Sequence, residues 1–226
     1  MLSDNALWRP FLDGIWITLQ VTFYGAALGT FMSVLSGLAS MSSVRGVRWV
    51  SRVYVDFFRG TSAIVQLFWI FYALPLIGPS FSPMVAGAVT LGLNMGSYGS
   101  EVVRGAVQAV PRGQTEASIA LNLSAMQRMQ YVIFPQAAVS MLPPYGNLLI
   151  ELLKASALVS LITLADITFV AQVLRVNGTA STLTLFSIAL VLYFVIAQGI
   201  ALVVRLAEAR LSQGLEVGRG AGRRAA

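Results

Sequence analysis

The sequence contains no cysteine and no histidine among its 226 residues. Disulfide bonds are therefore excluded, together with metal sites and catalytic centres built on thiolate or imidazole groups. Charged residues are also scarce, at 11% of the chain, which is about half their share in an ordinary soluble domain. The sequence has no G-x-x-x-x-G-K-[S/T] phosphate-binding loop and no evident pair of nucleophile and base, which makes an enzyme the least favoured class.

Hydrophobic residues are abundant instead, at 57% of the chain. A soluble fold of this size could not bury so much apolar surface, so we expect the lipid bilayer to act as its solvent. The sequence predicts an all-α, polytopic membrane protein with one domain at 1–214 and a basic disordered tail at 215–226. An apolar piece at 157–173 either continues a span or folds back. About five apolar segments approach the ~20 residues that cross a bilayer, and they lie at 15–41, 57–78, 84–100, 137–153 and 183–204.

The basic residues are unevenly distributed between the apolar segments. Twelve of the 15 follow the first segment, lie between the third and fourth, or fall in the tail, whereas Arg9, Lys154 and Arg175 lie on the other side. Loops rich in Lys and Arg face the cytoplasm, so we expect the N-terminus outside and the C-terminus in the cytoplasm. Topology thus accounts for the net charge of +6 without a nucleic-acid partner.

Small residues recur four positions apart in two of the apolar segments. The first segment contains a G-x-x-x-G motif at 25–29 and an S-x-x-x-G motif at 33–37, and the third contains a G-x-x-x-G motif at 92–96. Residues four apart share one helix face, and small side chains let two backbones approach closely. These motifs predict helix packing, within the chain or between chains.

The segment at 101–136 is a long polar interruption of this apolar sequence. Pro111 is expected to begin one short helix that reaches about Leu121, because proline is favoured in the first turn. The spacing Ser124-x-x-Gln127 is that of a capping box and predicts the start of a second short helix. Two short helices joined by a bend form a knob that a soluble partner can grip, while an amphipathic segment resting on lipid headgroups is the alternative.

The residues from Gly113 to Asn122, followed by the Val-Ile-Phe-Pro-Gln run at 132–136, resemble the EAA loop of binding-protein-dependent ABC importer permeases. Glu116 and Ala117 match the start of the family's triplet, and a serine stands at its usual third alanine. Asn122 stands where glycine is usual, and asparagine also tolerates the left-handed conformation that a sharp bend requires. The resemblance implies that the residues coupling this chain to an ATPase are Gly113, Gln114, Glu116, Ala117, Ser118, Asn122 and Pro135.

Two more stretches resemble the polar amino-acid and opine uptake permeases of that family. They are FFRGTSAIVQL at 57–67, with Ser62 at a usual proline position, and YGSEVVRGA at 98–106. The resemblance implies a type I ABC importer permease of a bacterial inner membrane that is itself non-catalytic and binds no cofactor. The implied partners are a second permease subunit (a copy or a sister), a cytoplasmic ATPase dimer that holds ATP and Mg, and an extracytoplasmic substrate-binding protein.

Glu151 and Lys154 are three residues apart, and hence on one helix face, at the end of the fourth segment. In one interpretation they form a structural ion pair at the membrane interface, with the lysine reaching the headgroups. In the other they line the solute route, where a carboxylate and an ammonium suit a zwitterion. The stretch at 146–158 resembles the family's Asn…Leu-Lys-Asp-Thr-Ser-Leu segment near the translocation path, with alanine at the usual Asp. That resemblance adds Asn147 and Ser156 to the pathway residues.

Five other polar side chains are assigned from their positions along the chain. Asp166 and Arg175 are expected on the outer surface, within reach of the binding protein. Gln66, Asn94 and Tyr98 are expected to form hydrogen bonds between packed spans.

Together these features predict the transmembrane permease subunit of an ATP-driven importer for a polar, amino-acid-like solute. ATP hydrolysis on partner chains would drive alternating access. Two other functions remain open: a permease for a zwitterionic compatible solute of the betaine or ectoine kind, and an autonomous secondary transporter or channel. The ligand of the partner binding protein separates the first two hypotheses, and transport by the isolated chain without ATP would identify the third.

Overall fold

The computed structural model describes residues 4–212, and every regular element within that range is helical, as predicted. The basic tail expected at 215–226 lies outside the described residues. The α-helices are α1 (Asp4–Ser40), α2 (Arg45–Gly60), α3 (Ala63–Phe68), α4 (Pro83–Ala109), α5 (Arg112–Ala120), α6 (Ala125–Arg128), α7 (Phe134–Ala155), α8 (Ile167–Val176) and α9 (Thr182–Ser212). The π and 3-10 turns are η1 (Trp69–Ala73), η2 (Leu74–Leu76), η3 (Met129–Ile133) and η4 (Ser156–Ile162).

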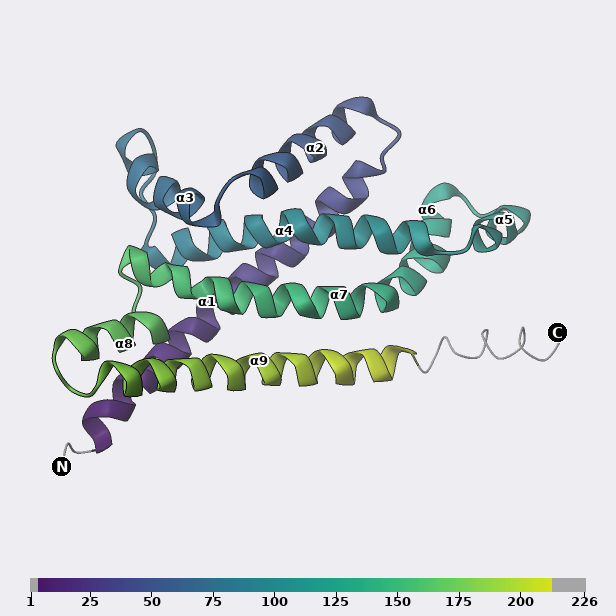
Figure 1. Ribbon diagram of the computed structural model, residues 1–226. Coiled ribbons are helices and arrows are strands. Elements are labelled where there is room, and N and C mark those ends of the chain that lie inside the picture. Colours follow the sequence, from purple (N-terminus) through teal and green to yellow (C-terminus); the bar gives the residue numbers. More distant parts are fainter. Residues whose placement is uncertain (1–3, 213–226) are drawn as a thin grey trace.

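The long helices run between two ends of the molecule (Figure 1). α4, α7 and α9 lie side by side, and α1 crosses them obliquely. α5 and α6 project from one end, which we call the α5–α6 end. α8 lies at the opposite end, which we call the α8 end, and there α1 begins. The polar loop is shorter than the predicted range 101–136, because α4 continues to Ala109.

Three segments within the described residues are long and apolar enough to cross a membrane, at 7–40, 125–162 and 182–211. A fourth is possible if α2 and the helical stretch 63–76 count as one broken span, bent by 102°. The expected span at 84–100 lies within α4, whose buried face is rich in small residues.

The expected span at 57–78 is not one straight helix. α2 ends at Gly60, and side chains complete the bend that follows it. Gln66 Nε2 donates to the carbonyl oxygen of Phe58 at 3.0 Å, and Asn94 Nδ2 donates to the same oxygen at 3.1 Å. These bonds satisfy a carbonyl that the end of the helix leaves without a donor. The expectation that Gln66 and Asn94 form packing hydrogen bonds is therefore confirmed.

The G-x-x-x-G motifs of α1 and α4 pack against each other within this chain. A methyl group added at Gly92 would lie 2.9 Å from the carbonyl oxygen of Gly25, and one added at Gly96 would lie 2.6 Å from Met32 Cβ. The backbones are thus as close as the motif predicts. We call this contact the α1–α4 seam. An apolar core built on α1, α4 and α7, including the fully buried Leu91, adjoins it.

The first part of the apolar piece at 157–173 continues α7 as η4, up to Ile162, and the rest folds back. The chain reverses at Thr163, whose φ is 65°, and α8 then packs against α1 and α9. The expectation that Asp166 lies on the outer surface is wrong, because its exposed fraction is 0%. Its carboxylate caps α8 by accepting from the N–H of Phe169 at 2.9 Å, and it accepts a second bond from Tyr193 Oη at 2.9 Å. Arg175 is exposed, as expected.

Candidate functional site

α5, α6 and η3 form a knob, residues 112–133, that projects from the α5–α6 end (Figure 1). α5 begins directly after Pro111, as predicted. The capping box is also present: the N–H of Gln127 donates to Ser124 Oγ at 3.3 Å, and the N–H of Ser124 donates to Gln127 Oε1 at 2.9 Å. Local sequence therefore determines both short helices of the knob.

The bend between α5 and α6 is centred on Asn122, whose φ of 58° lies in the left-handed region. The N–H of Asn122 donates to the carbonyl of Ile119 at 2.8 Å, and the N–H of Leu123 donates to that of Ser118 at 3.0 Å. These two bonds form a Schellman motif, which satisfies the last carbonyls of α5. Asparagine adopts this conformation more readily than other side-chain-bearing residues. The predicted tolerance of asparagine at this position is confirmed.

The surface of the knob combines charge with exposed apolar side chains. Five of the predicted coupling residues are exposed within the knob, Gly113, Gln114, Glu116, Ala117 and Asn122. Large apolar side chains are exposed in the same knob at Ile119, Leu121, Met126 and Tyr131. Apolar groups exposed together beside polar ones mark interaction surfaces. The knob therefore has the surface of an interaction site, for a protein partner or for lipid headgroups.

Two other predicted coupling residues act inside the loop or at its edge. Ser118 is only 2% exposed, and its hydroxyl donates to the carbonyl of Thr115 at 2.7 Å. Its role is thus to shape α5. Pro135 is exposed in the first turn of α7, where a proline leaves no helical hydrogen bond unmade.

A side-chain hydrogen bond ties the knob to α7, the helix that carries Glu151. Gln136 Nε2 donates to Gln114 Oε1 at 3.3 Å and to the carbonyl of Val132 at 2.9 Å. The sequence analysis missed this contact because the two glutamines are 22 positions apart. The hydrogen bond thus joins α5 of the knob to the first turn of α7.

A cavity of about 240 Å³, which we call the Glu151 cavity, lies between α4 and α7. Glu151 is the charged residue of its lining, and Tyr98 is 40% exposed beside it. The guanidinium carbon of Arg59 lies 5.2 Å from the centre of the Tyr98 ring, within cation–π distance. Glu151 and Tyr98 thus share the cavity wall, and the guanidinium over the Tyr98 ring comes from a residue outside the lining. The lining residues are Leu91, Asn94, Met95, Tyr98, Leu148, Glu151, Leu152 and Ala155.

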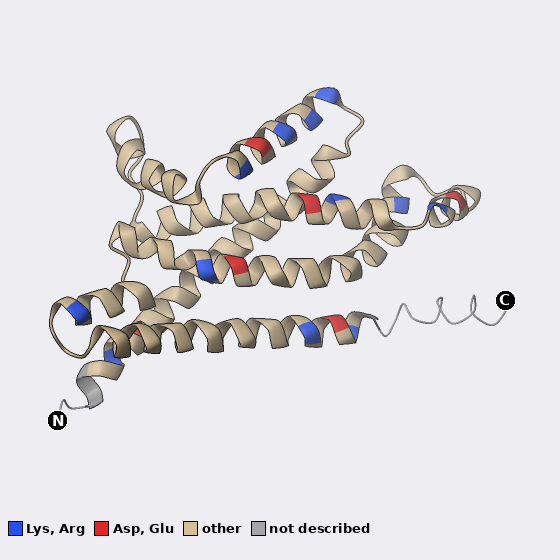
Figure 2. Ribbon diagram, viewed as in Figure 1, with Lys and Arg blue, Asp and Glu red and all other residues tan. Residues whose placement is uncertain are grey.

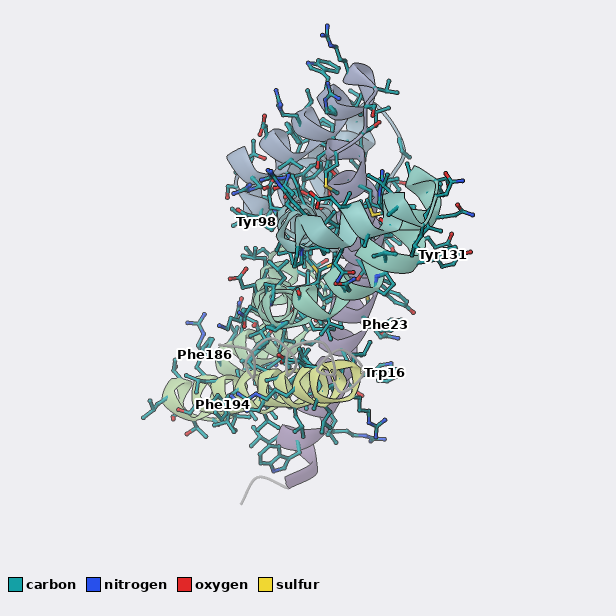
Figure 3. All side chains as sticks on the ribbon, turned by 90° about the vertical axis from the view of Figure 1, so that its right-hand side faces the viewer. Trp16, Phe23, Tyr98, Tyr131, Phe186 and Phe194 are labelled. Carbon is teal, nitrogen blue, oxygen red and sulfur yellow. The ribbon has the colours of Figure 1, made fainter. Side chains whose placement is uncertain are left out.

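The cavity lies on one side of the molecule. Figure 3 views the molecule from the α5–α6 end. Tyr98, on the cavity wall, lies on the left of that view, and Trp16 and Phe23 of α1 lie on the right. Tyr98 was expected to form a hydrogen bond between packed spans, and it lies instead on the wall of the cavity.

The structure separates the predicted pathway residues into two groups. Glu151, Lys154 and Asn147 are all exposed on α7, but of these only Glu151 lines the cavity. Ser156 has an exposed fraction of 0%, and its hydroxyl donates to the carbonyl of Leu153 at 2.7 Å. It is therefore a structural residue in this conformation, because a solute cannot reach it.

Ion pairing is nearly absent from the described residues. Between residues 4 and 212, the one ion pair within 4.0 Å joins Glu101 to Arg104 on α4. Glu151 and Lys154 are not paired with each other, so the interpretation of a structural ion pair is not supported. Across the same residues, no group of three acidic side chains gathers as a metal site would require.

The fold defines a class: an all-helical protein with segments of membrane-spanning length and an exposed, projecting knob. Residues 25–213 match the family described as the binding-protein-dependent transport system inner membrane component. The chain is 42% identical over 216 residues to the probable amino-acid ABC transporter permease protein y4tF of Sinorhizobium fredii, covering 91% of this chain and 90% of that protein.

A second relative is the L-cystine transport system permease protein TcyB of Bacillus subtilis, 33% identical over 94% of this chain and 91% of that protein. A crystal structure of an amino acid ABC transporter with histidines superimposes with a TM-score of 0.84 at 34% identity, covering 92% of this chain and 97% of that one. The chain therefore belongs to the family of binding-protein-dependent transport system inner membrane components, and it is an ABC importer permease.

Proposed function

We propose that the chain is the permease subunit of an importer for a polar amino acid. The observation that carries this proposal is the Glu151 cavity, whose lining includes the carboxylate of Glu151 and the ring of Tyr98, with the guanidinium of Arg59 lying over that ring although it is not part of the lining. An α-amino acid presents an ammonium, which would pair with Glu151, and a carboxylate, for which the cation beside the cavity is Arg59. The similarity to permeases named for amino acids and for L-cystine supports the same substrate class.

Glu151 is the residue we expect to contact the solute. Asn147 and Lys154 lie one turn before and one turn after it on α7, so the three side chains share a helix face. In the assembled transporter we expect that face to line the solute route. Ionisable groups inside a membrane protein commonly line such a route, because their burial in lipid is costly.

The knob couples the permease to an ATPase on partner chains, which hold the ATP and Mg. In this proposal Glu116 forms charge-assisted hydrogen bonds in a groove of the ATPase, and the exposed Ile119 and Leu121 fill its apolar part. ATP binding pulls the two ATPases together, and the knob passes that movement to α7 through Gln114 and Gln136. The helices then alternate between outward and inward access.

The α5–α6 end is the cytoplasmic end in this proposal. Figure 2 shows the cationic residues concentrated along α2, at the knob and at the end of α9, with few toward the α8 end. Positively charged segments remain in the cytoplasm. The N-terminus then lies outside, the C-terminus inside, and residues 1–214 form one transmembrane domain. The bound partners are a second permease subunit, an ATPase dimer and an extracytoplasmic binding protein.

The substrate is tested by purifying the tagged complex and denaturing its binding protein to identify the released solute by mass spectrometry. We expect an α-amino acid, taken up by liposomes carrying the complex only with ATP and binding protein present. A betaine-like or ectoine-like solute would overturn the substrate assignment. Uptake by the isolated chain without ATP would overturn its role as a subunit.

The Glu151 contact is tested by uptake kinetics in the same liposomes. Glu151→Gln should raise the KM for uptake by about tenfold or more, as expected when one charge-assisted hydrogen bond is lost. Charge reversal in Glu151→Lys or Lys154→Glu should abolish uptake. Glu208→Gln is the matched control, because it removes an acidic group on α9 away from the cavity. Unchanged kinetics in both Glu151 variants would refute the contact.

A further inference from the structure

A second and larger cavity lies between α2 and α4, nearer the α5–α6 end. Its volume is about 680 Å³, and we call it the α2–α4 cavity. Most of its lining side chains are polar, and five of them are ionisable. The lining residues are Ser40, Met41, Arg48, Ser51, Arg52, Val55, Asp56, Glu101, Arg104 and Gln108.

Three of the five charged side chains in this cavity form hydrogen bonds or ion pairs within the protein, and two do not. Glu101 accepts from Arg104 Nε at 3.1 Å, and the two form an ion pair. Arg48 donates to the carbonyl of Ser42. The side chains of Arg52 and Asp56, in contrast, form no hydrogen bond or ion pair with any residue between 4 and 212. They are four residues apart, so a guanidinium and a carboxylate face the same cavity from successive turns of α2.

The two cavities follow one another along α4. The Glu151 cavity uses the α4 residues between 91 and 98, whereas the α2–α4 cavity uses those between 101 and 108. At 1.5 Å per residue, their centres are about 15 Å apart along the helix. The second cavity thus lies between the first and the α5–α6 end (Figure 1).

We propose that the α2–α4 cavity is a release-side subsite that holds the transported amino acid by its charged ends, the carboxylate on Arg52 and the ammonium on Asp56. The inference rests on the proposed function, which makes the α5–α6 end cytoplasmic. Solute that has left the Glu151 cavity passes this subsite before it enters the cytoplasm. When cytoplasmic solute is abundant, it reoccupies the subsite and slows the return of the permease.

The mixture of charges favours a zwitterionic solute over an anionic lipid headgroup. Two carboxylates, Asp56 and Glu101, stand among the guanidinium groups. A phosphate there would be repelled by both carboxylates, whereas a zwitterion pairs with either sign.

The first test uses the unaltered complex in liposomes, with the amino acid released from its binding protein as the probe. Uptake of labelled amino acid from outside is measured with increasing unlabelled amino acid inside. We expect the internal amino acid to inhibit uptake, and its N-acetyl and α-carboxamide derivatives to inhibit about tenfold less, because each lacks one charge. Derivatives that inhibit as strongly as the amino acid, or no inhibition by the amino acid itself, would overturn the proposal.

The second test locates the inhibition. Each variant is compared with its own uptake rate in liposomes without internal solute. Arg52→Gln and Asp56→Asn should each raise the internal concentration that halves uptake by about tenfold. Arg45→Gln is the matched control, since it removes an exposed arginine of the same helix that does not line the cavity. Equal inhibition in all three variants would overturn the assignment to this cavity.

These tests separate the inference from the function on which it rests. If the proposed function fails, uptake that depends on ATP and binding protein is absent altogether. If only the release-side subsite fails, that uptake is present and does not respond to the internal amino acid.

Discussion

The α1–α4 seam and the knob are both read from short sequence motifs, yet they are opposite kinds of structure. At the seam, glycines bring two backbones so close that no further atom fits, as between Gly92 and Gly25. In the knob, Glu116 and its neighbours are exposed, and only a few hydrogen bonds fix the bend. The comparison indicates that stability resides in the packed helices, while the coupling part is left free to bind.

The seam should show the largest loss of stability. Gly92→Ala would place Cβ 2.9 Å from the carbonyl oxygen of Gly25 and 3.0 Å from Leu28 Cβ. Neither backbone can move without disturbing the core, so we expect a loss of about 1–3 kcal/mol or more. Gly105→Ala on the same helix is the control, because no atom lies within 4 Å of its added Cβ. Thermal unfolding in detergent followed by tryptophan fluorescence should show a lower Tm for Gly92→Ala alone. Equal Tm values would contradict the seam.

The Asp166 cap should show the next largest effect, at the α8 end. Asp166→Ala removes the cap of α8 and one of the two hydrogen-bond partners of the Tyr193 hydroxyl, the other being Thr168, at a cost of about 2 kcal/mol. Asp166→Asn keeps an acceptor for the N–H of Phe169 and should cost much less at neutral pH. The same Tm measurement compares the two variants. A loss as large in the asparagine variant would contradict the capping role.

The pH dependence of the cap gives a finer test. Asp166 lies outside the three segments of membrane-spanning length, and burial raises the pKa of its carboxyl above the ordinary value, against the opposing effect of its hydrogen bonds. The folded state then holds the proton more tightly than the unfolded state, so ionisation lowers stability. Stability is lost as pH rises from about 4, the ordinary aspartate pKa, through the raised pKa of the folded state. Over that pH range the Tm of Asp166→Asn should rise relative to the Tm of the native chain. A Tm difference that stays constant with pH would contradict the raised pKa of Asp166.

The bend of the knob should show a smaller effect. Asn122→Ala keeps a β-carbon in the left-handed region but loses the polar side chain that makes this conformation tolerable, at a cost of about 1 kcal/mol, whereas Asn122→Gly removes the β-carbon and its strain. We expect the alanine variant to lose affinity for the ATPase and the glycine variant to keep it. The measurement is the amount of ATPase recovered with each purified variant. Equal recovery from both would show that the conformation at Asn122 does not matter for docking.

Local features of the chain were predictable because a few neighbouring residues determine them. The capping box at Ser124, the helix start at Pro111 and the left-handed bend at Asn122 each depend on contacts within one turn. The G-x-x-x-G motifs predicted close packing for a similar reason, although they did not say which helices would meet. The spacing of the small residues defines one helix face that a second helix can approach closely, and it does not identify that second helix.

Features that depend on distant residues could not be predicted in the same way. The burial of Asp166 requires Tyr193, which is 27 positions away, and the bend after α2 requires Asn94, which is 36 positions from Phe58. Ser156 was assigned to the pathway from the resemblance, yet it lies on the buried side of its turn. Glu151, whose carboxyl lines the cavity, was identified because a charge in an apolar segment is costly and therefore usually pairs or lines a cavity.

The central claim is that the knob transmits force without contributing to the stability of the fold. The most direct measurement is affinity purification of Glu116→Lys beside Glu208→Lys, which makes the same change of charge at the end of α9. We expect both variants to unfold at the native Tm, with the ATPase recovered from Glu208→Lys and lost from Glu116→Lys. Full recovery of the ATPase with Glu116→Lys would contradict the account.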